Sequence, residues 1–215
     1  MSAKLPDGAT LSIAVTYGSP KTVSAITNAN PGVASSTAHG MSNGALMEVL
    51  SGWNKINDRI IRVSAQATDT FALEGIDTTD TTMFPVGTGA GTVREITAFT
   101  QIAQILGFST TGGDPTEVKF SFLDEDFERT LPSVYSAQTV KIDIADDPSL
   151  AGYIALKAAS DARALRALKL SLRGGSSVIY NGIVALNETP TVTKGAVMAV
   201  TATFSLQGRP VRYAS

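Results

Sequence analysis

The sequence predicts a mainly β protein in which one helix packs on a sheet and a small all-β unit interrupts the chain early. Three observations predict this class. Apolar and polar residues alternate in many short runs, which glycine, asparagine and aspartate separate as they separate β-strands. Only one segment, at about 148–160, has residues at helical spacing that follow a helix start signal, Asp-Pro. Of the 215 residues, 43% are hydrophobic and 17% are charged, which allows a sizeable core under a lightly charged surface.

The N-terminal third is predicted to consist of short strands. Leu11, Ile13 and Val15 share one face of the first, and Gly18-Ser19-Pro20 forms the turn that follows it. The expected strands cover residues 10–17, 21–27, 32–38, 44–50, 59–65 and 69–74. The Thr- and Gly-rich segment 76–91 is predicted to be a linker, because its GTGAG run lacks the setting and full glycine spacing of a phosphate-binding loop.

The middle of the chain is predicted to continue the sheet. Residues 92–108 are rich in β-branched side chains and indicate one or two strands, although a helix over 95–106 is also possible. Alternation then indicates strands at 118–124 and 136–145. The segment 113–132 is expected to form a long hairpin or loop with a charged tip.

The predicted helix starts with Asp147 as its cap and Pro148 in its first turn, and it ends near 160–162. The residues expected to follow helical spacing are Leu150, Ile154, Lys157 and Ala158. A hairpin at 167–186 follows, with its turn at 174–177. In the last strand, 196–206, Met198, Val200, Ala202, Phe204 and Leu206 share one face, and Val197, Ala199, Thr201, Thr203 and Ser205 share the other.

Charge and composition exclude several function classes. The net charge of −2 argues against a protein that grips nucleic acid through a basic face. The absence of cysteine excludes disulfides, zinc–thiolate sites and thiol nucleophiles. No run approaches the 18 or so apolar residues of a membrane span, and the first residues lack the apolar stretch of a signal peptide, so we expect a soluble protein.

His39, the only histidine, could be a catalytic base, a metal ligand or a polar residue in a turn. A general base needs a substrate proton within reach and usually a partner that orients it, and no sequence neighbour supplies one. A metal site would need carboxylates alone as its other ligands. The glycine-flanked setting therefore favours a turn, and we expect no catalytic and no metal-binding residue in the chain.

A charged run at 123–129 contains the residues Asp124, Glu125, Asp126, Phe127, Glu128 and Arg129. Paired carboxylates can hydrolyse glycosides or hold a hard cation, but the spacing of a calcium loop is missing. Adjacent residues of an extended chain also point to opposite faces. The run is better interpreted as a solvated hairpin tip or a contact loop.

Charge is also distributed unevenly along the chain. Residues 114–147 hold nine acidic and three basic side chains. Residues 157–173 reverse this balance, and the candidate basic contact residues there are Arg163, Arg166, Lys169 and Arg173. Opposite patches on a nearly neutral chain suit self-association, since complementary charge sets the register of contacts. Two ordinary solvated faces are the alternative.

The C-terminal half runs in the order helix, strand, hairpin, strand, and closes with Gly208-Arg209-Pro210. In this order and spacing it resembles the lambda-type major tail protein, the tail tube protein of tailed bacteriophages. The Asp-Pro helix start, the Gly-Gly hairpin turn and Gly182 carry the resemblance. The stretches 8–18 and 112–133 are similar to parts of related tail tube proteins.

Residues 20–82 resemble a different unit, a small β module that recurs in phage structural proteins. Its pattern includes Thr37-x-His39-Gly40, Asn43-Gly44 and Thr70-Phe71-x-Leu73-x-Gly75. The module is itself similar to a β-barrel-like domain of ubiquitin-activating enzymes, without that enzyme's catalytic parts. In it the His-Gly pair is a turn element, which the resemblance implies for His39.

The tail tube resemblance implies a β-sandwich or barrel built from residues 1–19 and 83–215, flanked by the helix, with the domain 20–82 inserted on the outer surface. It implies that six copies close into a ring and that rings stack into a hollow tube. The tube would surround a tape-measure protein, conduct DNA without binding it specifically, and meet terminator and tail-tip or baseplate proteins. Such a component of the virion is assembled in the host cytoplasm and needs no cofactor.

Two further details follow from the resemblance, and rivals remain. A projecting module argues for a long, non-contractile tail, and 113–132 would dock on the adjacent ring. The small side chains of the last strand suit subunit or lumen contact. The rivals are a capsid decoration or receptor-binding β protein, which shares the module and the composition, and a glycosidase, which rests on the run 123–129 alone.

Overall fold

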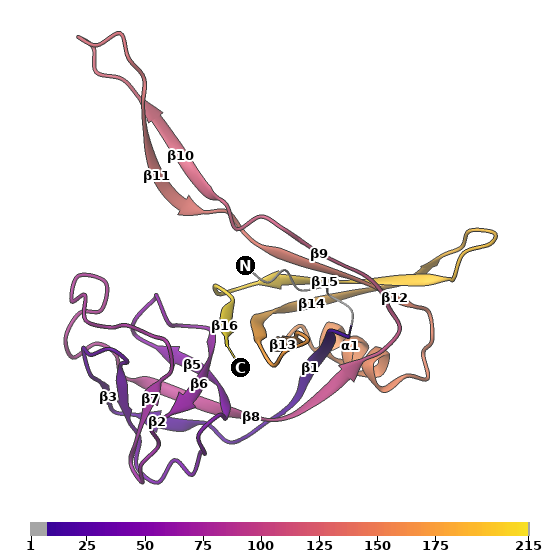
Figure 1. Cartoon of the computed structure of the whole chain (residues 1–215), viewed down its shortest axis with the longest axis horizontal. Helices are drawn as coiled ribbons and strands as arrows, with labels where there is room; N and C mark the ends of the chain where they lie inside the picture. Colours follow the sequence, from indigo (N-terminus) through magenta and orange to yellow (C-terminus); the bar gives the residue numbers. More distant parts are fainter. Residues whose placement is uncertain (1–7, 215) are drawn as a thin grey trace.

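The structure, a computed structural model, describes residues 8–214 as one long curved sheet, one helix and a projecting hairpin (Figure 1). Residues 1–7, part of the first predicted domain segment, lie outside the described residues. The strands are β1 (Thr10–Tyr17), β2 (Lys21–Val23), β3 (Ala25–Ile26), β4 (Val33–Ser35), β5 (Leu46–Ser51), β6 (Arg59–Ser64), β7 (Thr70–Leu73), β8 (Gly91–Ile102), β9 (Ile105–Thr111), β10 (Pro115–Phe120), β11 (Arg129–Tyr135), β12 (Thr139–Ala145), β13 (Leu165–Ser171), β14 (Ser177–Thr191), β15 (Ala199–Leu206) and β16 (Val211–Tyr213). The mainly β class with one helix is thus confirmed.

All pairings in the long sheet are antiparallel, and the order is β3-β4-β7-β6-β5-β8-β1-β13-β14-β15-β12-β9. Strand β2 also pairs with β8, and β16 also pairs with β14. Strand β8 is shared by the two parts of this sheet. Its residues 91–95 pair with β5, and its residues 96–102 pair with β1. Strands β10 and β11 form a separate two-stranded sheet, which projects from the body.

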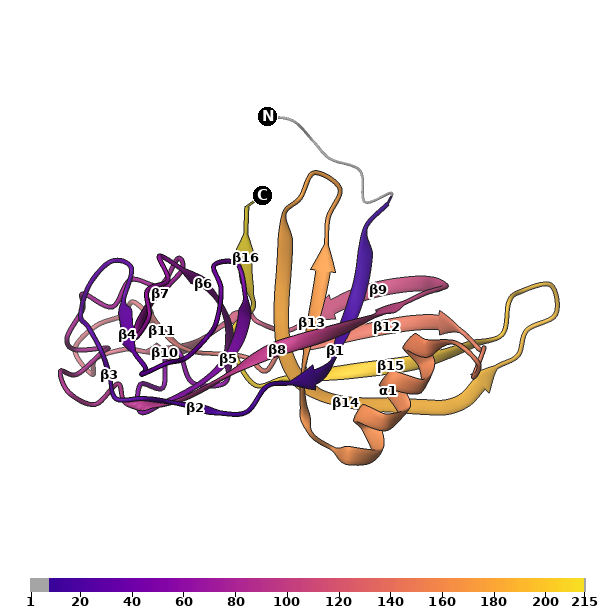
Figure 2. The same ribbon diagram turned by 90° about the horizontal axis from the view of Figure 1, so that it is seen from below.

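Residues 21–93 form a small lobe around their own core, at the left of Figures 1 and 2. Trp53 and Phe71 are its largest fully buried side chains. The predicted linker at 76–91 is wrong, because this segment has no regular structure yet packs into the lobe. Asn28 donates to the carbonyls of Thr78 and Phe84 at 2.9 and 2.8 Å, and the Trp53 indole donates to Pro85 at 2.9 Å. Partners of this kind let irregular backbone lie in a core.

The main lobe, residues 10–17 and 96–213, packs helix α1 (Ala151–Ala162) against its sheet (Figure 2). The helix buries the stripe Gly152, Tyr153, Leu156 and Ala159, whereas Ile154, one of the residues expected at helical spacing, is 56% exposed. A Cβ on Gly152 would lie 2.7 Å from the Gln101 carbonyl oxygen, which explains why glycine stands where the helix crosses β8.

The predicted helix start is also wrong. Asp147 accepts bonds from the Ser149 amide at 3.0 Å and the Ser149 hydroxyl at 2.6 Å, and these bonds lower the pKa of Asp147. Its carboxylate is therefore engaged in a local turn. The helix begins three residues after Pro148, with Leu150 as an N-cap that makes no side-chain bond.

The two lobes share a buried junction. Apolar side chains from both lobes form one cluster: Ala14, Leu46, Ile60, Ile96, Ala167, Ile179, Val211 and Tyr213. Beside it, Glu48 of β5 is ion-paired with Arg94 of β8 and accepts a bond from the Asn181 amide of β14 at 3.2 Å. The Tyr213 hydroxyl accepts the Arg62 amide at 2.7 Å. The small lobe is therefore joined to the main lobe by buried contacts as well as by the chain.

The other predicted elements have mixed outcomes. Residues 92–108 form two strands, so the alternative helix over 95–106 is wrong. The last long strand begins at Ala199, and the preceding Val197 and Met198 are both exposed. Strand β16 was not predicted. Among residues 8–214, no helix has the length and apolar character to cross a bilayer.

Candidate assembly surfaces

His39 is a structural residue of a turn. It is 3% exposed, its Nδ1 accepts the Met41 amide at 3.1 Å, and its Nε2 lies 2.9 Å from the Ala67 carbonyl oxygen. Because Nδ1 is an acceptor, the proton must be on Nε2, which donates to that carbonyl. The ring also meets Phe71 edge to face, with centroids 5.0 Å apart. Both nitrogens are engaged, which confirms the turn interpretation.

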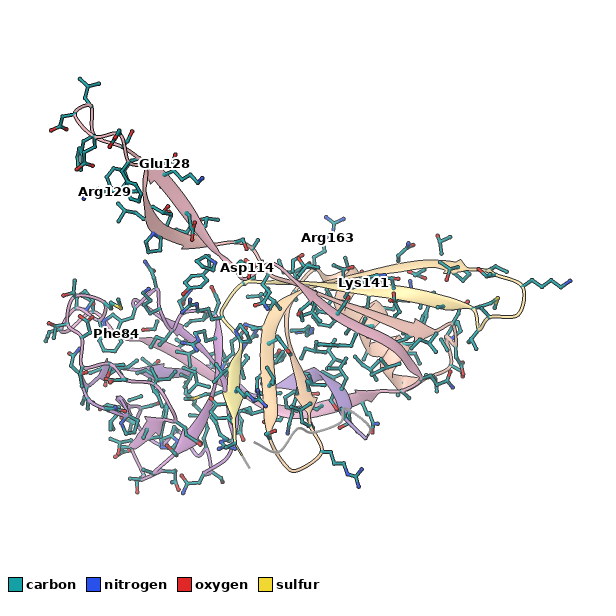
Figure 3. All side chains as sticks on the ribbon, turned by 45° about the horizontal axis from the view of Figure 1, so that its top comes forward. Phe84, Asp114, Glu128, Arg129, Lys141 and Arg163 are labelled. Atoms are coloured by element: carbon teal, nitrogen blue, oxygen red, sulfur yellow. The ribbon has the colours of Figure 1, made fainter. Side chains whose placement is uncertain are left out.

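The long hairpin predicted at 113–132 is present, and it extends to Tyr135. We call residues 113–135 the arm. Figure 3 shows Asp114 at its base, and Glu128 and Arg129 toward its far end. Nearly all its side chains are exposed, including Leu123, which is fully exposed, and Phe127, which is 71% exposed. An isolated two-stranded ribbon with exposed apolar side chains indicates a binding element.

The arm tip, residues 121–128, is only partly neutralised by the arm's own charges. Glu125 pairs with Arg129 at 2.6 Å, and Glu128 pairs with Lys119 at 3.4 Å. Asp124 and Asp126 form no ion pair within residues 8–214. Carboxylates held on an exposed tip have no walls to bind a sugar, so this placement does not support a glycosidase.

The four predicted basic residues do not form one patch. Arg163 adopts a left-handed conformation just after α1 and points to solvent (Figure 3), whereas Arg173 lies beyond the other end of β13. Arg166 and Lys169 are half-buried over aromatic rings, with Arg166 5.5 Å from the Tyr17 centroid and Lys169 5.7 Å from the Phe99 centroid. Two of the four are therefore partly engaged within the chain.

The sheet β14-β15-β12-β9 has one face on the core and one face open. The open side, which we call the small-residue face, consists of Gly107, Ser109, Thr111, Thr139, Lys141, Asp143, Ile183, Ala185, Asn187, Thr191, Ala199, Thr201, Thr203 and Ser205. Its two charges, Lys141 and Asp143, pair with each other at 3.2 Å. The hydroxyl of Thr201 and this lysine lower the pKa of Asp143. The face therefore carries mainly small and polar side chains and is electrically neutral. Ile183 is its one large apolar member, and a hollow of about 330 Å³ beside Leu106 opens on it.

Strand β9 ends the sheet order and has β12 as its only partner strand among the described residues. Leu106 on it is 55% exposed and Phe108 is 37% exposed. A strand at an edge presents unpaired amide and carbonyl groups, and proteins cover such edges or use them for pairing. The sequence alternation at 105–111 could not indicate that this strand would be the edge.

A cavity of about 650 Å³ lies at the arm's root, lined by both lobes. The cavity could not be predicted from the sequence, because its walls come from parts of the chain far apart: Arg59, Gly112, Gly113, Tyr135, Ser136, Ala137, Gln138, Leu206, Gln207, Gly208, Arg209 and Pro210. The Gly112-Gly113 pair was the only local signal. Gly112 has a φ of +77°, and a Cβ on it would lie 2.0 Å from the Ala137 carbonyl oxygen.

Comparison with known proteins identifies the family. A search of curated proteins finds no match to the chain. The family model for the phage tail tube protein matches residues 51–215. The match begins at the last residue of β5 and includes the arm, α1, the small-residue face and the root cavity. The chain therefore belongs to the phage tail tube protein family, whose members are structural components of the tail and not enzymes.

Proposed function

We propose that six copies of this chain close into a ring and that rings stack into the hollow tube of a lambda-type, non-contractile tail. The observation that carries the proposal is the exposed edge and open face of the sheet β14-β15-β12-β9. Strand β9 has a free side with apolar Leu106 and Phe108, which a neighbouring copy can cover. A heterologous contact repeated around an axis closes a ring when the rotation that relates neighbouring copies is a whole fraction of a full turn.

The small-residue face is the surface that we assign to the lumen. DNA carries closely spaced negative charge, and a basic lining would bind it. The pairing of Lys141 with Asp143 leaves this face neutral, and its short hydroxyl and methyl groups offer little to hold a moving chain. This chemistry suits a conduit that surrounds a tape-measure protein before ejection and lets DNA pass without specific binding.

The small lobe is assigned to the outside of the tube, where it leaves the lumen open. The similarity of residues 20–82 to a module of phage structural proteins supports this placement. Terminator and tail-tip or baseplate proteins would contact the two ends of the tube. Assembly would take place in the host cytoplasm, before the tail joins the virion.

Ring formation is tested by sedimentation velocity of the full chain with a matched pair of variants. Leu106→Asp places a charge on the exposed β9 edge, and Met83→Asp does so at a side chain of similar exposure, 52% against 55%, in the small lobe. The wild type and Met83→Asp should sediment as species of six chains or larger assemblies, and Leu106→Asp as monomer. Equal sedimentation of the two variants would contradict the edge contact.

The inside and outside assignments are tested by labelling assembled tubes. The chain has no cysteine, so Thr203→Cys and Thr81→Cys each introduce a unique thiol on the small-residue face and on the small lobe. After reaction with a biotin maleimide, streptavidin should decorate Thr81→Cys tubes and be excluded from Thr203→Cys tubes. The reverse pattern would show that the lumen and the outer surface are exchanged.

A further inference from the structure

The root cavity brings two arginines together. It is lined by Arg59 of β6, by Arg209 from the segment between β15 and β16, and by Tyr135 at the root end of the arm. Neither arginine forms an ion pair within residues 8–214. The cavity therefore concentrates positive charge that the described chain does not neutralise.

The state of Arg59 supports this interpretation. Its Nη1 donates to the Lys55 carbonyl oxygen at 3.3 Å, but its Nε is buried without a partner in the described part of the chain. Burial and the charge of Arg209 lower the pKa of Arg59, against an opposite effect of Tyr213. The Arg209 guanidinium lies 3.8 Å from the centroid of the Tyr135 ring, which leaves its edges available for an acceptor. A carboxylate entering the cavity would satisfy both arginines.

The arm tip has the complementary chemistry. Asp124 and Asp126 form no ion pair among the described residues, and Leu123 and Phe127, which flank them in sequence, are exposed to solvent. Carboxylates next to apolar side chains match a cavity that offers guanidinium groups next to an aromatic ring. No other described hairpin of the chain joins two unpaired carboxylates to two exposed large apolar residues.

The tip cannot reach the cavity of its own chain. Strand β10 carries the chain six residues from Asp114 at the root to Phe120, so at about 3.3 Å per residue the paired part of the arm alone is about 20 Å long, and the tip lies beyond it. Pairing of β10 with β11, from Pro115–Tyr135 to Phe120–Arg129, holds this part straight, and Figure 1 shows the tip far from the body. An arm tip that enters the cavity must therefore belong to a second copy.

We propose that the root cavity receives the arm tip of a copy in the neighbouring ring, with tip carboxylates facing Arg59 and Arg209 and tip apolar side chains packed beside Tyr135. This inference rests on the proposed stacking of rings and names both sides of the contact. Each copy has one tip and one cavity, so the contact is head-to-tail and can repeat without limit. The arm's length then sets the spacing of successive rings.

Cross-linking tests the contact directly. A chain with Leu123→Cys at the tip and Gln207→Cys at the cavity has no other thiol. Under mild oxidation, assembled tubes should give a ladder of covalent oligomers on a non-reducing gel. The control pair, Leu123→Cys with Thr81→Cys in the small lobe, should stay monomeric on the same gel. Equal ladders, or tubes without a ladder from the first pair, would overturn the proposal.

Charge exchange tests the chemistry by electron microscopy and sedimentation. Arg209→Glu should leave single rings and reduce stacked tubes at least tenfold, as should Asp124→Arg with Asp126→Arg. Combining the two tip changes with both Arg59→Glu and Arg209→Glu should restore tubes, because the charges on both sides of the contact are then reversed. Lys21→Glu, an exposed base away from the cavity, should leave tubes unchanged.

The outcomes separate this inference from the proposed function. If the wild-type chain forms no rings, the proposed function fails and the contact fails with it. If the wild type forms tubes and Arg209→Glu does so equally well, the function stands and the root cavity is not the receptor. Loss of tubes in the charge-exchanged combination, with rings intact in all variants, would also contradict the proposal.

Discussion

Glu48 is the residue on which the joint between the lobes depends. Its side chain is 2% exposed and is held by Arg94 and by the Asn181 amide, which also donates to the Asp58 carbonyl at 2.9 Å. Burial and the charge of Glu48 raise the pKa of Asp58, which indicates that negative charge is concentrated here. One strand of each lobe and the shared strand β8 therefore meet at a single carboxylate.

Glu48→Leu should destabilise the chain by about 2 kcal/mol, because it removes the ionic partner of Arg94, which is 34% exposed, and one of the two acceptors of the buried Asn181 amide. Replacing both charges in Glu48→Leu/Arg94→Met should recover much of this loss, since a buried pair is worth little more than apolar residues of similar size. Thermal or denaturant unfolding measures both. Equal losses in the single and double variants would show that the ion pair is not the source.

Gly152→Ala gives a test in which two effects have opposite signs. In an exposed helix position this change should stabilise by about 1 kcal/mol. Here the new Cβ would lie 2.7 Å from the Gln101 carbonyl oxygen and 2.8 Å from the Ile102 Cα, both backbone atoms. We expect a net loss of about 1–3 kcal/mol as α1 is pushed off β8. Ala158→Gly, at an exposed position of the same helix, measures the propensity alone, and a gain on Gly152→Ala would refute the close contact.

At the scale of elements, the arm tip can be replaced without loss of the fold, so its role in assembly can be tested separately. Replacing residues 123–129 by a Gly/Ser loop of equal length removes exposed side chains, so the thermal midpoint should stay within about 2 °C. Rings should persist while long tubes disappear. Electron microscopy of the two proteins at equal concentration decides this, and tubes of normal length from the variant would rule out the arm as the stacking element.

The sequence predicted those elements whose pattern lies within a few neighbouring residues, and it failed where contacts with distant residues decide the structure. Alternation located the strands at both ends of the sheet, and the charged run at 123–129 sat on a hairpin tip as expected. Asp147-Pro148 failed as a helix start because Ser149 binds the Asp147 carboxylate in a turn. The segment 76–91 has the composition of a linker, but Thr78 and Phe84 are buried by contacts with residues about 50 positions earlier.

The candidate site was less predictable than the fold. The tip residues were identified from their charge, yet the cavity joins Arg59 to Arg209 across 150 positions of sequence. The four basic residues at 163–173 share a sequence window, but β13 separates Arg163 from Arg173 and aromatic rings engage the other two. Surfaces of this kind depend on which strands become neighbours, and local pattern does not contain that information.

At the scale of the whole molecule, the two lobes should unfold together. Strand β8 belongs to both, and the apolar cluster at their junction draws on both. The single tryptophan, Trp53, is buried in the small lobe, so its fluorescence reports that lobe while far-UV circular dichroism reports the whole sheet. The two thermal transitions should coincide within about 2 °C. An earlier fluorescence transition would show that the small lobe is an independent domain.

The same junction changes what a deletion can show about the small lobe. Replacing residues 20–82 by a linker would remove Leu46 and Ile60 from the shared cluster and expose Ile179 and Val211 of the main lobe. Loss of rings after this deletion would therefore have two possible causes: a main lobe that no longer folds, or a missing contact between subunits. Labelling at Thr81 locates the lobe without this ambiguity.

Electron microscopy of the purified wild-type chain at high concentration and low salt tests the central claim most directly. The account predicts sixfold rings with an open centre that stack into hollow tubes. The spacing of successive rings should exceed the paired length of the arm, about 20 Å, by the length of the tip that lies beyond it. The density of the small lobe should lie on the outer wall. Particles that remain monomeric, or that form closed assemblies without a central channel, would contradict the account.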